Sequence, residues 1–443
     1  MPARGRCAGQ RLVIGQGHSL SSIFLYSFVQ HYLSGRLSQY LLLLACLAGV
    51  AGLLASRALV AIAPIVGVVA ALANPQLRRA IPSYFRNGAA LRAAAVMVFL
   101  LISGFYTTEL LVWRHELFRD LTWLAVPLAF TLAVPLTRGQ RLVVGSGFVL
   151  GVAAVGLATL VHYWQNPVTA NEDILYGRNM PVATHIFHIT FGVMLALAAM
   201  WGMMLRQHAL ARPLLRVALL GAVAVAVLTL HVLAYRTGLL VFYVALLAVV
   251  ARMLLRRNLG LGLGLLGLLV AGPWAAYRGL ESVHQRVDST LWDVYQLTDG
   301  NDINETSLSR RLVAIETARQ VIAQHWLVGV APADTRAAMM YQYDWQGFGL
   351  RPENRIEVHN QFLQALVGGG VLGLALLLAV MFWPLSRPWA RRQPAIGLFL
   401  LMQATSMLVD APLDLQLGLN LFVFGYGFLV VAGERQAVQE LAA

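Results

Sequence analysis

Long apolar runs separated by short polar connections dominate this sequence. A helix needs roughly 20 apolar residues to cross a bilayer, and somewhat fewer suffice when its ends are polar and snorkel. Counting runs on that basis predicts about twelve membrane-spanning helices and an all-α polytopic membrane protein. The expected spans cover residues 40–55, 58–73, 93–112, 121–136, 142–162, 181–205, 217–235, 238–255, 259–276, 361–385, 395–412 and 415–432.

The arginines predict which ends of these spans face inward. They gather on alternate connections, and the positive-inside rule assigns such connections to the cytoplasm. The clusters are Arg78 and Arg79, Arg138 and Arg141, Arg206 to Arg216, Arg252 to Arg257, and Arg387 to Arg392. Both termini are then cytoplasmic. The opposite connections are residues 114–120, 163–180, the tight turn at Arg236-Thr237, residues 277–358, and the turn 410–414.

This topology divides the chain into five parts. Residues 1–39 are expected to form a cytoplasmic or interfacial tail, because the polar residues Gln16, His18 and Gln30 interrupt the apolar core that a cleavable signal peptide needs. Residues 40–276 hold spans one to nine, and residues 277–358 form one long outer loop. Residues 359–433 hold the last three spans, and residues 434–443 form a cytoplasmic tail.

Composition supports the membrane class and excludes others. The chain is 58% hydrophobic and 12% charged, with a mean hydropathy of +0.67, which no ordinary soluble protein reaches. The net charge of +13 does not indicate nucleic-acid binding, because the chain has no lysine and its arginines lie between apolar runs. Cys7 and Cys46 form no disulfide framework or metal-ligand pattern, which argues against redox chemistry.

The outer loop differs from the rest of the chain. It holds eight arginines and eleven acidic residues, a formal charge of −3. Leu308–Trp326 is predicted to be an amphipathic helix capped by Ser307, with Leu308, Ile315, Ile322 and Trp326 on one stripe. Arg311 shares that stripe. Tyr341–Phe348 is an aromatic cluster typical of either sugar stacking or a membrane-interface belt.

His359 is the first candidate for chemistry, because it opens a span directly after the outer loop. An imidazole with a reference pKa near ~6.5 accepts a proton from a hydroxyl at neutral pH, and Asn360 could hydrogen-bond a substrate. A structural role is the alternative for such a histidine. Gly369, Gly370 and Gly373 predict that the helix behind it passes close to a neighbour.

Arg236 and Arg311 are the candidates for an anion site. Both are expected at the outer face, and two guanidinium groups can hold a diphosphate by paired hydrogen bonds. The alternatives are an arginine that reaches lipid headgroups at position 236 and a salt bridge from Arg311 to Glu305 or Glu316. His185 and His188, expected on the sixth span, and His231 are assigned to packing or hydrogen bonds between helices.

The sequence contains no recognisable metal or phosphate-loop motif. His-Glu-x-x-His, a Walker loop and Gly-x-Ser-x-Gly are all absent. Asp410 and Asp414 are half of a metal site without partners. The glycine-rich run Leu259–Gly264 is typical of close helix packing. Metal-independent chemistry without a cofactor is therefore favoured.

Four short motifs in order resemble those of one bacterial family. His359-Asn360 is followed by Gly370-Val371-Leu372-Gly373, and upstream lie Arg236-Thr237-Gly238, Ser309-Arg310-Arg311 and Gly329-Val330-Ala331-Pro332. Together with about twelve spans and one long loop before the histidine, they resemble the O-antigen ligase and polymerase superfamily. The resemblance covers Val217 to Gly373.

The resemblance implies a function and its partners. It implies an enzyme of the bacterial inner membrane that transfers a glycan from undecaprenyl diphosphate to lipid A–core at the periplasmic face. By the same resemblance His359 is the general base and Arg236 and Arg311 bind the donor diphosphate. Asn360, Tyr235 and Arg310 are possible supporting residues, with no metal and no cofactor.

Three other functions use the same features. An O-antigen polymerase would accept a second lipid-linked glycan, and a protein O-oligosaccharyltransferase would accept serine or threonine; the motifs do not encode the acceptor. A transporter or flippase would need pseudo-symmetric halves and ionisable groups near the midplane of the membrane. The candidate residues instead gather at one outer edge, which argues against a transporter. Within the superfamily, the tight Arg-Thr-Gly entry and the single long outer loop look most like the ligase branch.

Overall fold

The computed structural model describes residues 30–175, 179–298, 303–346 and 348–442, and within those ranges it contains helices and no strands. Inside a membrane no water is available to the backbone. An apolar run therefore forms a helix, because a helix satisfies its N–H and C=O groups within the run. The α-helices are α2 (Arg36–Ala55), α3 (Arg57–Leu72), α4 (Leu77–Arg86), α5 (Gly88–Ser103), α6 (Leu110–Asp120), α7 (Thr122–Leu132), α8 (Arg138–Gln165), α9 (Pro167–Leu175), α10 (His188–His208), α11 (Pro213–Val232), α12 (Arg236–Leu255), α13 (Leu259–Gly279), α14 (Glu281–Thr298), α15 (Ser307–His325), α16 (Thr335–Trp345), α17 (Gln361–Ser386), α18 (Pro388–Arg391), α19 (Pro394–Val409), α20 (Gln416–Tyr426) and α21 (Ala432–Ala442). Single turns lie at η1 (Ile303–Glu305), η2 (Pro332–Asp334), η3 (Pro352–Asn354) and η4 (Pro412–Asp414), and a π-helical turn, η5 (Gly427–Val431), joins α20 to α21.

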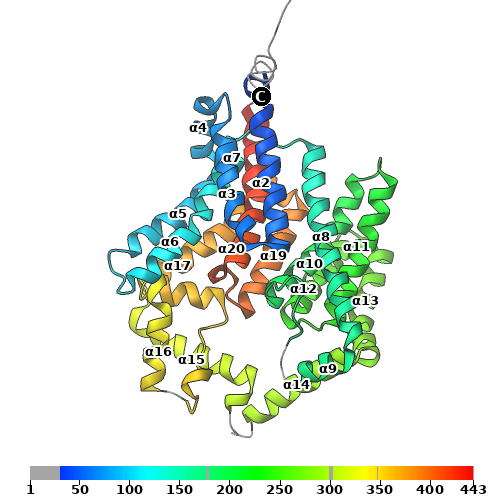
Figure 1. The fold of residues 1–443 in the computed structure, drawn as a ribbon, viewed down its shortest axis with the longest axis vertical. Helices are drawn as coiled ribbons and strands as arrows, with labels where there is room; N and C mark the ends of the chain where they lie inside the picture. The colour runs from blue at the N-terminus through cyan, green and yellow to red at the C-terminus, as the bar shows by residue number, and fades with distance from the viewer. Residues whose placement is uncertain (1–29, 176–178, 299–302, 347, 443) are drawn as a thin grey trace, which may run out of the picture.

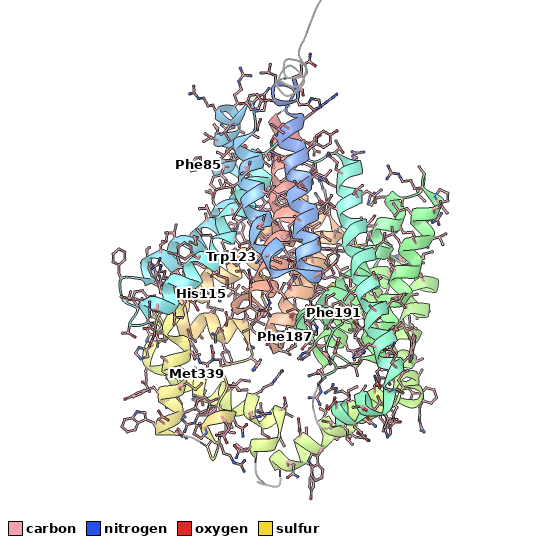
Figure 2. The ribbon with its side chains drawn as sticks, viewed as in Figure 1. Phe85, His115, Trp123, Phe187, Phe191 and Met339 are labelled. Atoms are coloured by element: carbon pink, nitrogen blue, oxygen red, sulfur yellow. The ribbon has the colours of Figure 1, made fainter. Side chains whose placement is uncertain are left out.

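The helices form a bundle, and four helices lie together across one end of it. Figure 1 shows α2, α3, α19 and α20 in the middle, α8 and α10 to α13 on one side, and α4 to α7 with α17 on the other. Helices α9, α14, α15 and α16 lie together at the end opposite the C-terminus. In Figure 2, Phe85 on α4 and Met339 on α16 mark these two ends. The predicted loop therefore lies at the end of the bundle opposite α4, which carries Arg78 and Arg79.

The expected count of twelve spans is not confirmed. Within the described residues, eight helices are long and apolar enough to cross a membrane, or nine if α4 and α5, bent by 80° at their junction, are one span. The predicted span 93–112 is interrupted after Ser103, and 121–136 contains only the 11-residue α7. Helices α3 and α19, each of 16 residues, are shorter than a full span. Apolar runs predicted where helices lie, but not where they break.

Several boundaries also differ from the expectation. The sixth span begins at His188 rather than residue 181. The predicted cytoplasmic tail 434–443 continues as helix α21 to Ala442. Of the predicted N-terminal tail, residues 1–29 lie outside the described residues. In the glycine run on α13, only Gly262 is closely packed, since a Cβ there would lie 2.6 Å from Leu254, whereas Gly260 and Gly264 face open space.

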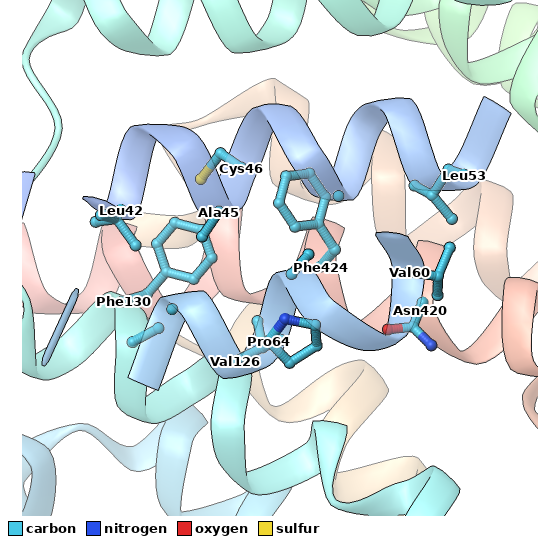
Figure 3. Close-up of a pocket in the computed structure, with 14 residues that line it drawn as sticks. Leu42, Ala45, Cys46, Leu53, Val60, Pro64, Val126, Phe130, Asn420 and Phe424 are labelled. Atoms are coloured by element: carbon cyan, nitrogen blue, oxygen red, sulfur yellow. The ribbon is translucent and has the colours of Figure 1, made fainter. Parts of the chain in front are cut away.

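A small apolar pocket lies in the middle of the bundle between α2, α3, α7 and α20. Figure 3 shows Cys46, Phe130 and Phe424 among its lining residues, and its volume is about 30 Å³. A space of that size holds about one water molecule and has almost no polar lining. It is too small to hold a sugar or a lipid headgroup.

Helix α17 is broken at Gly370, and this break positions the outer end. Gly370 has φ +58° and ψ −157°, which is not helical. The loop after α15 pairs with the break through backbone hydrogen bonds: Val330 N–H donates to Val367 O at 3.0 Å, Ala331 N–H to Gly368 O at 3.0 Å, and Val371 N–H to Trp326 O at 2.9 Å. A Cβ on Gly329 would lie 2.5 Å from the Gly368 backbone. The predicted close approach at Gly369 and Gly370 is confirmed, and the neighbour is this loop together with Phe99.

Candidate functional site

His359 forms a hydrogen-bonded pair with Asp410. Its Nδ1 lies 2.9 Å from Asp410 Oδ1. Because the carboxylate accepts, Nδ1 carries the proton and Nε2 is left with its lone pair. The His359 side chain is 32% exposed and that of Asp410 is 7% exposed, so the ring is accessible while its partner is buried. The pair has the arrangement of a base and the group that orients it.

The backbone around the pair is held on both sides. Asn360 Oδ1 accepts from the N–H groups of Phe362 and Leu363 at 3.0 Å, which makes Asn360 the N-cap of α17, and its Nδ2 donates to Leu408 O at 2.9 Å. Gln361 N–H donates to Asp410 O at 3.1 Å. Asn360, predicted as a supporting residue, therefore fixes the segment that carries His359.

Arg236 is placed by a tight crossing of two helices. A Cβ on Gly238 would lie 2.7 Å from the backbone of Gly192, so α10 and α12 touch at these glycines. The turn between α11 and α12 covers residues 233–235, with Ala234 at φ +47°, and Arg236 is the first residue of α12. The prediction of a turn at Arg236-Thr237 was wrong, because the turn lies earlier, at residues 233–235, and both of these residues belong to α12. Glycine at position 238 brings the start of α10 next to Arg236.

Arg236 is half-buried and has few hydrogen-bond partners. Its Nη2 donates to Ser289 Oγ at 3.4 Å, and its Nε is buried without a hydrogen-bond partner among the described residues. A buried guanidinium with open donors costs free energy unless an anion completes it. This environment fits an anion site better than an arginine that reaches out to lipid headgroups.

A second arginine that we did not predict stands beside it. Arg286, on α14, is 5% exposed and donates to Asn179 Oδ1 at 2.8 Å. Burial and, to a smaller extent, the charge of Arg236 together lower the pKa of Arg286 to about 10. Two guanidinium groups close enough to repel are stable together when an anion lies between them.

Arg311 reaches the histidine pair from α15. Its Nη1 donates to Val409 O at 3.2 Å. Burial lowers the pKa of Arg311, and the nearby Asp410 carboxylate raises it. The expected alternative of a salt bridge to Glu316 is wrong, since Glu316 pairs with Arg319 at 2.6 Å; the side chain of Glu305 lies outside the described residues. Arg310 points elsewhere, with Nη1 donating to Asn354 Oδ1 at 3.3 Å.

The predicted helix over Leu308–Trp326 is confirmed as α15, with two corrections. Its N-cap is Thr306 rather than Ser307, and no side chain caps it. Its buried face carries Ala314, Ala318 and Val321, whereas Ile315 and Trp326 of the predicted stripe are exposed. The helix packs against α16 and α17 through Ala314, Ala318 and Val321, with Val313 and Ile322 partly buried beside them.

The other histidines and Tyr235 have distinct positions. His188, which opens α10, stacks 5.9 Å from the ring of Tyr235, and it lies within electrostatic range of Arg286, Arg311 and Asp410. Tyr235 is fully buried and its hydroxyl donates to Met180 O at 3.0 Å, so it supports the packing. His231 bonds Tyr243 at 2.8 Å, as expected for a packing residue. His185 was placed wrongly on a span, since it lies outside α10.

The predicted aromatic cluster is divided between surface and core. Tyr341 and Trp345 are exposed with ring centroids 6.1 Å apart, whereas Tyr343 is buried and donates to Ile356 O at 3.1 Å; Gly347 lies outside the described residues. In the part of the chain that the structure describes, no group of three or more His, Cys, Asp or Glu has metal-site geometry.

The site therefore consists of a histidine pair beside converging positive charge. Arg236 lies within electrostatic range of Arg311 and of Asp293, a buried carboxylate on α14 that accepts from the start of α15. The cluster contains three arginines and His188 and only two carboxylates, those of Asp293 and Asp410. Its net charge is therefore positive. Such a cluster suits a diphosphate.

The part of the chain from residue 221 to 378 matches the family model described as O-antigen ligase. Residues 221–378 therefore carry the sequence pattern of the O-antigen ligase/polymerase superfamily. No curated protein sequence matches the chain closely enough to count as a relative. The match, together with the apolar helices, supports glycan transfer of the ligase or polymerase type by a multi-pass bacterial membrane protein. The matched segment includes Arg236, Arg286, Arg311 and His359, but neither Asp410 nor His188.

Asp410, Arg286 and His188 are the site residues that sequence reasoning missed. Asp410 was seen only as half of a metal site. A signal for Arg286 does exist, because Ser282, Arg286, Ser289 and Asp293 recur at helical spacing and all four are buried on α14. The polar face of a surface helix is normally exposed to solvent, so a buried polar stripe on α14 indicates a site.

Proposed function

We propose that this protein transfers a glycan from undecaprenyl diphosphate to lipid A–core at the periplasmic face of the bacterial inner membrane. The observation that carries the proposal is the His359–Asp410 pair next to three arginines, of which Arg286 is buried and Arg236 and Arg311 are half-buried. The pair supplies a base and the arginines supply counter-charge for a diphosphate. The family match independently supports a lipid-linked glycan as substrate.

The arginines bind the donor and stabilise its leaving group. Arg236, Arg286 and Arg311 bond the diphosphate oxygens, and their fixed charges offset the negative charge that builds on the diphosphate as the glycosidic bond breaks. In a partly desolvated site such fixed charges act strongly. This role needs no metal ion, because the guanidinium groups remain charged at any physiological pH.

His359 activates the acceptor. Nε2 of the ring takes the proton of an acceptor hydroxyl while that oxygen attacks the anomeric carbon of the donor sugar. The bond from the anomeric carbon to the diphosphate oxygen breaks, and undecaprenyl diphosphate leaves. Asp410 stabilises the imidazolium that forms and keeps Nδ1 as the donor. A single displacement of this kind inverts the anomeric centre.

Purified protein in liposomes with an undecaprenyl-diphosphate glycan tests the proposal. His359→Ala should bind donor normally and lose about 10²–10⁴-fold in transfer rate. Transfer close to that of wild type would rule out the base. Arg311→Lys keeps the charge but loses the paired N–H donors of the guanidinium group, so the KM for the donor should rise. The control is Arg319→Lys, at a surface position on the same helix.

The acceptor distinguishes the ligase from its alternatives. The same liposomes are supplied separately with lipid A–core, with a second donor lipid, or with a serine-containing pilin peptide. Transfer to lipid A–core supports the ligase, and transfer to the donor lipid or the peptide supports a polymerase or a protein O-oligosaccharyltransferase. Movement of the lipid across the bilayer without transfer would support a transporter instead.

A further inference from the structure

A large cavity lies close to the histidine pair and is lined by Gln361. Its volume is about 380 Å³, and it is enclosed by α5, α6, the start of α7, α17, the start of α16 and η4. Trp123, labelled in Figure 2 at the start of α7, lines it. None of the three arginines of the anion site contributes to it, so the cavity is a separate site.

The cavity and the histidine pair share a wall. Gln361 lines the cavity and is two residues from His359. Its Nε2 donates to Asp414 Oδ1 at 3.2 Å and its Oε1 accepts from Leu413 N–H at 2.8 Å, while its backbone N–H donates to Asp410 O. A molecule in the cavity therefore lies against the segment that holds the base.

The cavity has an apolar part and an acidic part. Phe99, Leu100, Trp123 and Leu377, from α5, α7 and α17, form the apolar part. The acidic part holds Glu116, Asp120, Glu357 and Asp414 against two arginines, both already paired: Arg119 with Asp120 at 2.8 Å, and Arg336 with Glu357 at 3.2 Å. Val112 and Leu415 in the lining are exposed, so the cavity reaches the surface.

The groups left open in the cavity are hydrogen-bond acceptors. Glu116 makes no hydrogen bond with any described residue, and burial raises its pKa to about 7. Gln364 Oε1 is buried without a partner, although its Nε2 donates to Glu357 at 3.5 Å. Burial raises the pKa of Asp414 to about 6. Open acceptors require a ligand that donates, so hydroxyl and ammonium groups fit and phosphate or carboxylate groups do not.

We propose that this cavity binds the acceptor, an amphipathic glycolipid whose entering sugar is uncharged or carries an amino group. The sugar lies between Glu116 and Gln364, and the chain lies along the wall formed by Phe99 and Leu377. The proposal rests on the proposed function for the identity of the ligand as acceptor. Two sites of opposite charge then flank His359, one for the donor diphosphate and one for the acceptor sugar.

Binding is tested in the absence of donor by fluorescence quenching with brominated alkyl glycosides. A glucoside and a glucosamine-headed lipid should quench Trp123, and a lipid with a glucose-phosphate head should not. Because the chain has ten tryptophans, Trp123→Phe serves as the reference, and wild type should show additional, saturable quenching beyond that of this variant. Equal quenching by the phosphate-headed lipid, or identical quenching of wild type and Trp123→Phe, would overturn the proposal.

Kinetics with an amino-sugar acceptor test the role of Glu116. Above pH 7, where Glu116 is ionised, Glu116→Gln should raise the acceptor KM about tenfold and leave the donor KM unchanged, because a charge-assisted hydrogen bond is lost. The control is Glu109→Gln, an exposed residue next to the same helix. An unchanged acceptor KM would contradict the proposal. Since quenching needs no transfer, it also separates failure of this site from failure of His359 as a base.

Discussion

His359 and Asp410 are 51 residues apart in sequence and 2.9 Å apart in the structure. The helices α17 and α19 bring them together, with Arg311 bound to the residue that precedes Asp410. Replacement of Asp410 by Asn should keep the shape and let the amide donate to Nδ1, which places the proton on Nε2. We expect the rate of transfer to fall about 10²–10⁴-fold with little change in donor KM.

The control for that experiment is Asp344→Asn, because Asp344 is an exposed carboxylate that pairs with Arg355 in the same outer segment. A structural role for Asp410 would instead lower the thermal stability and the donor affinity together. Full activity in Asp410→Asn would show that the pair does not orient the base.

Arg286 should contribute to donor binding. Arg286→Lys keeps a charge but loses the planar fork, so we expect the donor KM and the Kd for undecaprenyl diphosphate to rise by more than tenfold. Arg278→Lys, an exposed position at the end of α13, should change neither. An equal small effect in both variants would exclude Arg286 from the anion site.

Gly370 should not tolerate a side chain. Its φ of +58° disfavours any residue with a Cβ, and that Cβ would clash with the backbone of Leu327. Gly370→Ala should lower the unfolding free energy by about 2–4 kcal/mol and lower Tm in detergent. Gly264→Ala, where a Cβ meets nothing within 4 Å, is the matched control and should not lower Tm. A lower Tm in both variants would point to a general effect of replacing glycine.

The carboxyl of Glu116 makes stability depend on pH. Burial raises its pKa from 4.5 to about 7, with Asp414, Asp120 and Glu357 adding to the rise and Arg119 opposing it. The protonated form is therefore favoured on folding. Its contribution is complete below pH 4.5 and is lost as the pH rises through 7. Between pH 4.5 and 7 the Tm of wild type should fall relative to that of Glu116→Gln. Plots of Tm against pH that run parallel for the two proteins would contradict the raised pKa of Glu116.

Polar residues at the ends of apolar runs could be recognised from sequence. His359, Arg236 and Arg311 each interrupt or border an apolar pattern, so each stands out, and the structure brings Arg236 and Arg311 close together with His359 beside them. Their roles stay predictions. The all-helical class was equally visible, because apolar composition over such lengths permits little else.

Other features depend on contacts that no spacing encodes. Asp410 was visible in sequence, but its partner was not, since a polar pair from two helices has no fixed interval. The number of spans could not be settled from the sequence, because an apolar run such as 93–112 does not show that α5 ends at Ser103, where Gly104 packs against Trp113. The buried face of α15 was misplaced because small residues, rather than large apolar ones, form it.

The backbone bonds between the α15 loop and the break in α17 join Arg311 rigidly to the His359 helix, whereas Arg286 belongs to α14, which packs on α9 and α13. The anion site is therefore divided between two parts of the outer surface. The three guanidinium groups repel one another in an empty site, and a bound diphosphate offsets that repulsion. Helices α14 and α15 also contact each other directly, so we expect this contact to become more stable when undecaprenyl diphosphate binds, which hydrogen exchange of both helices would measure.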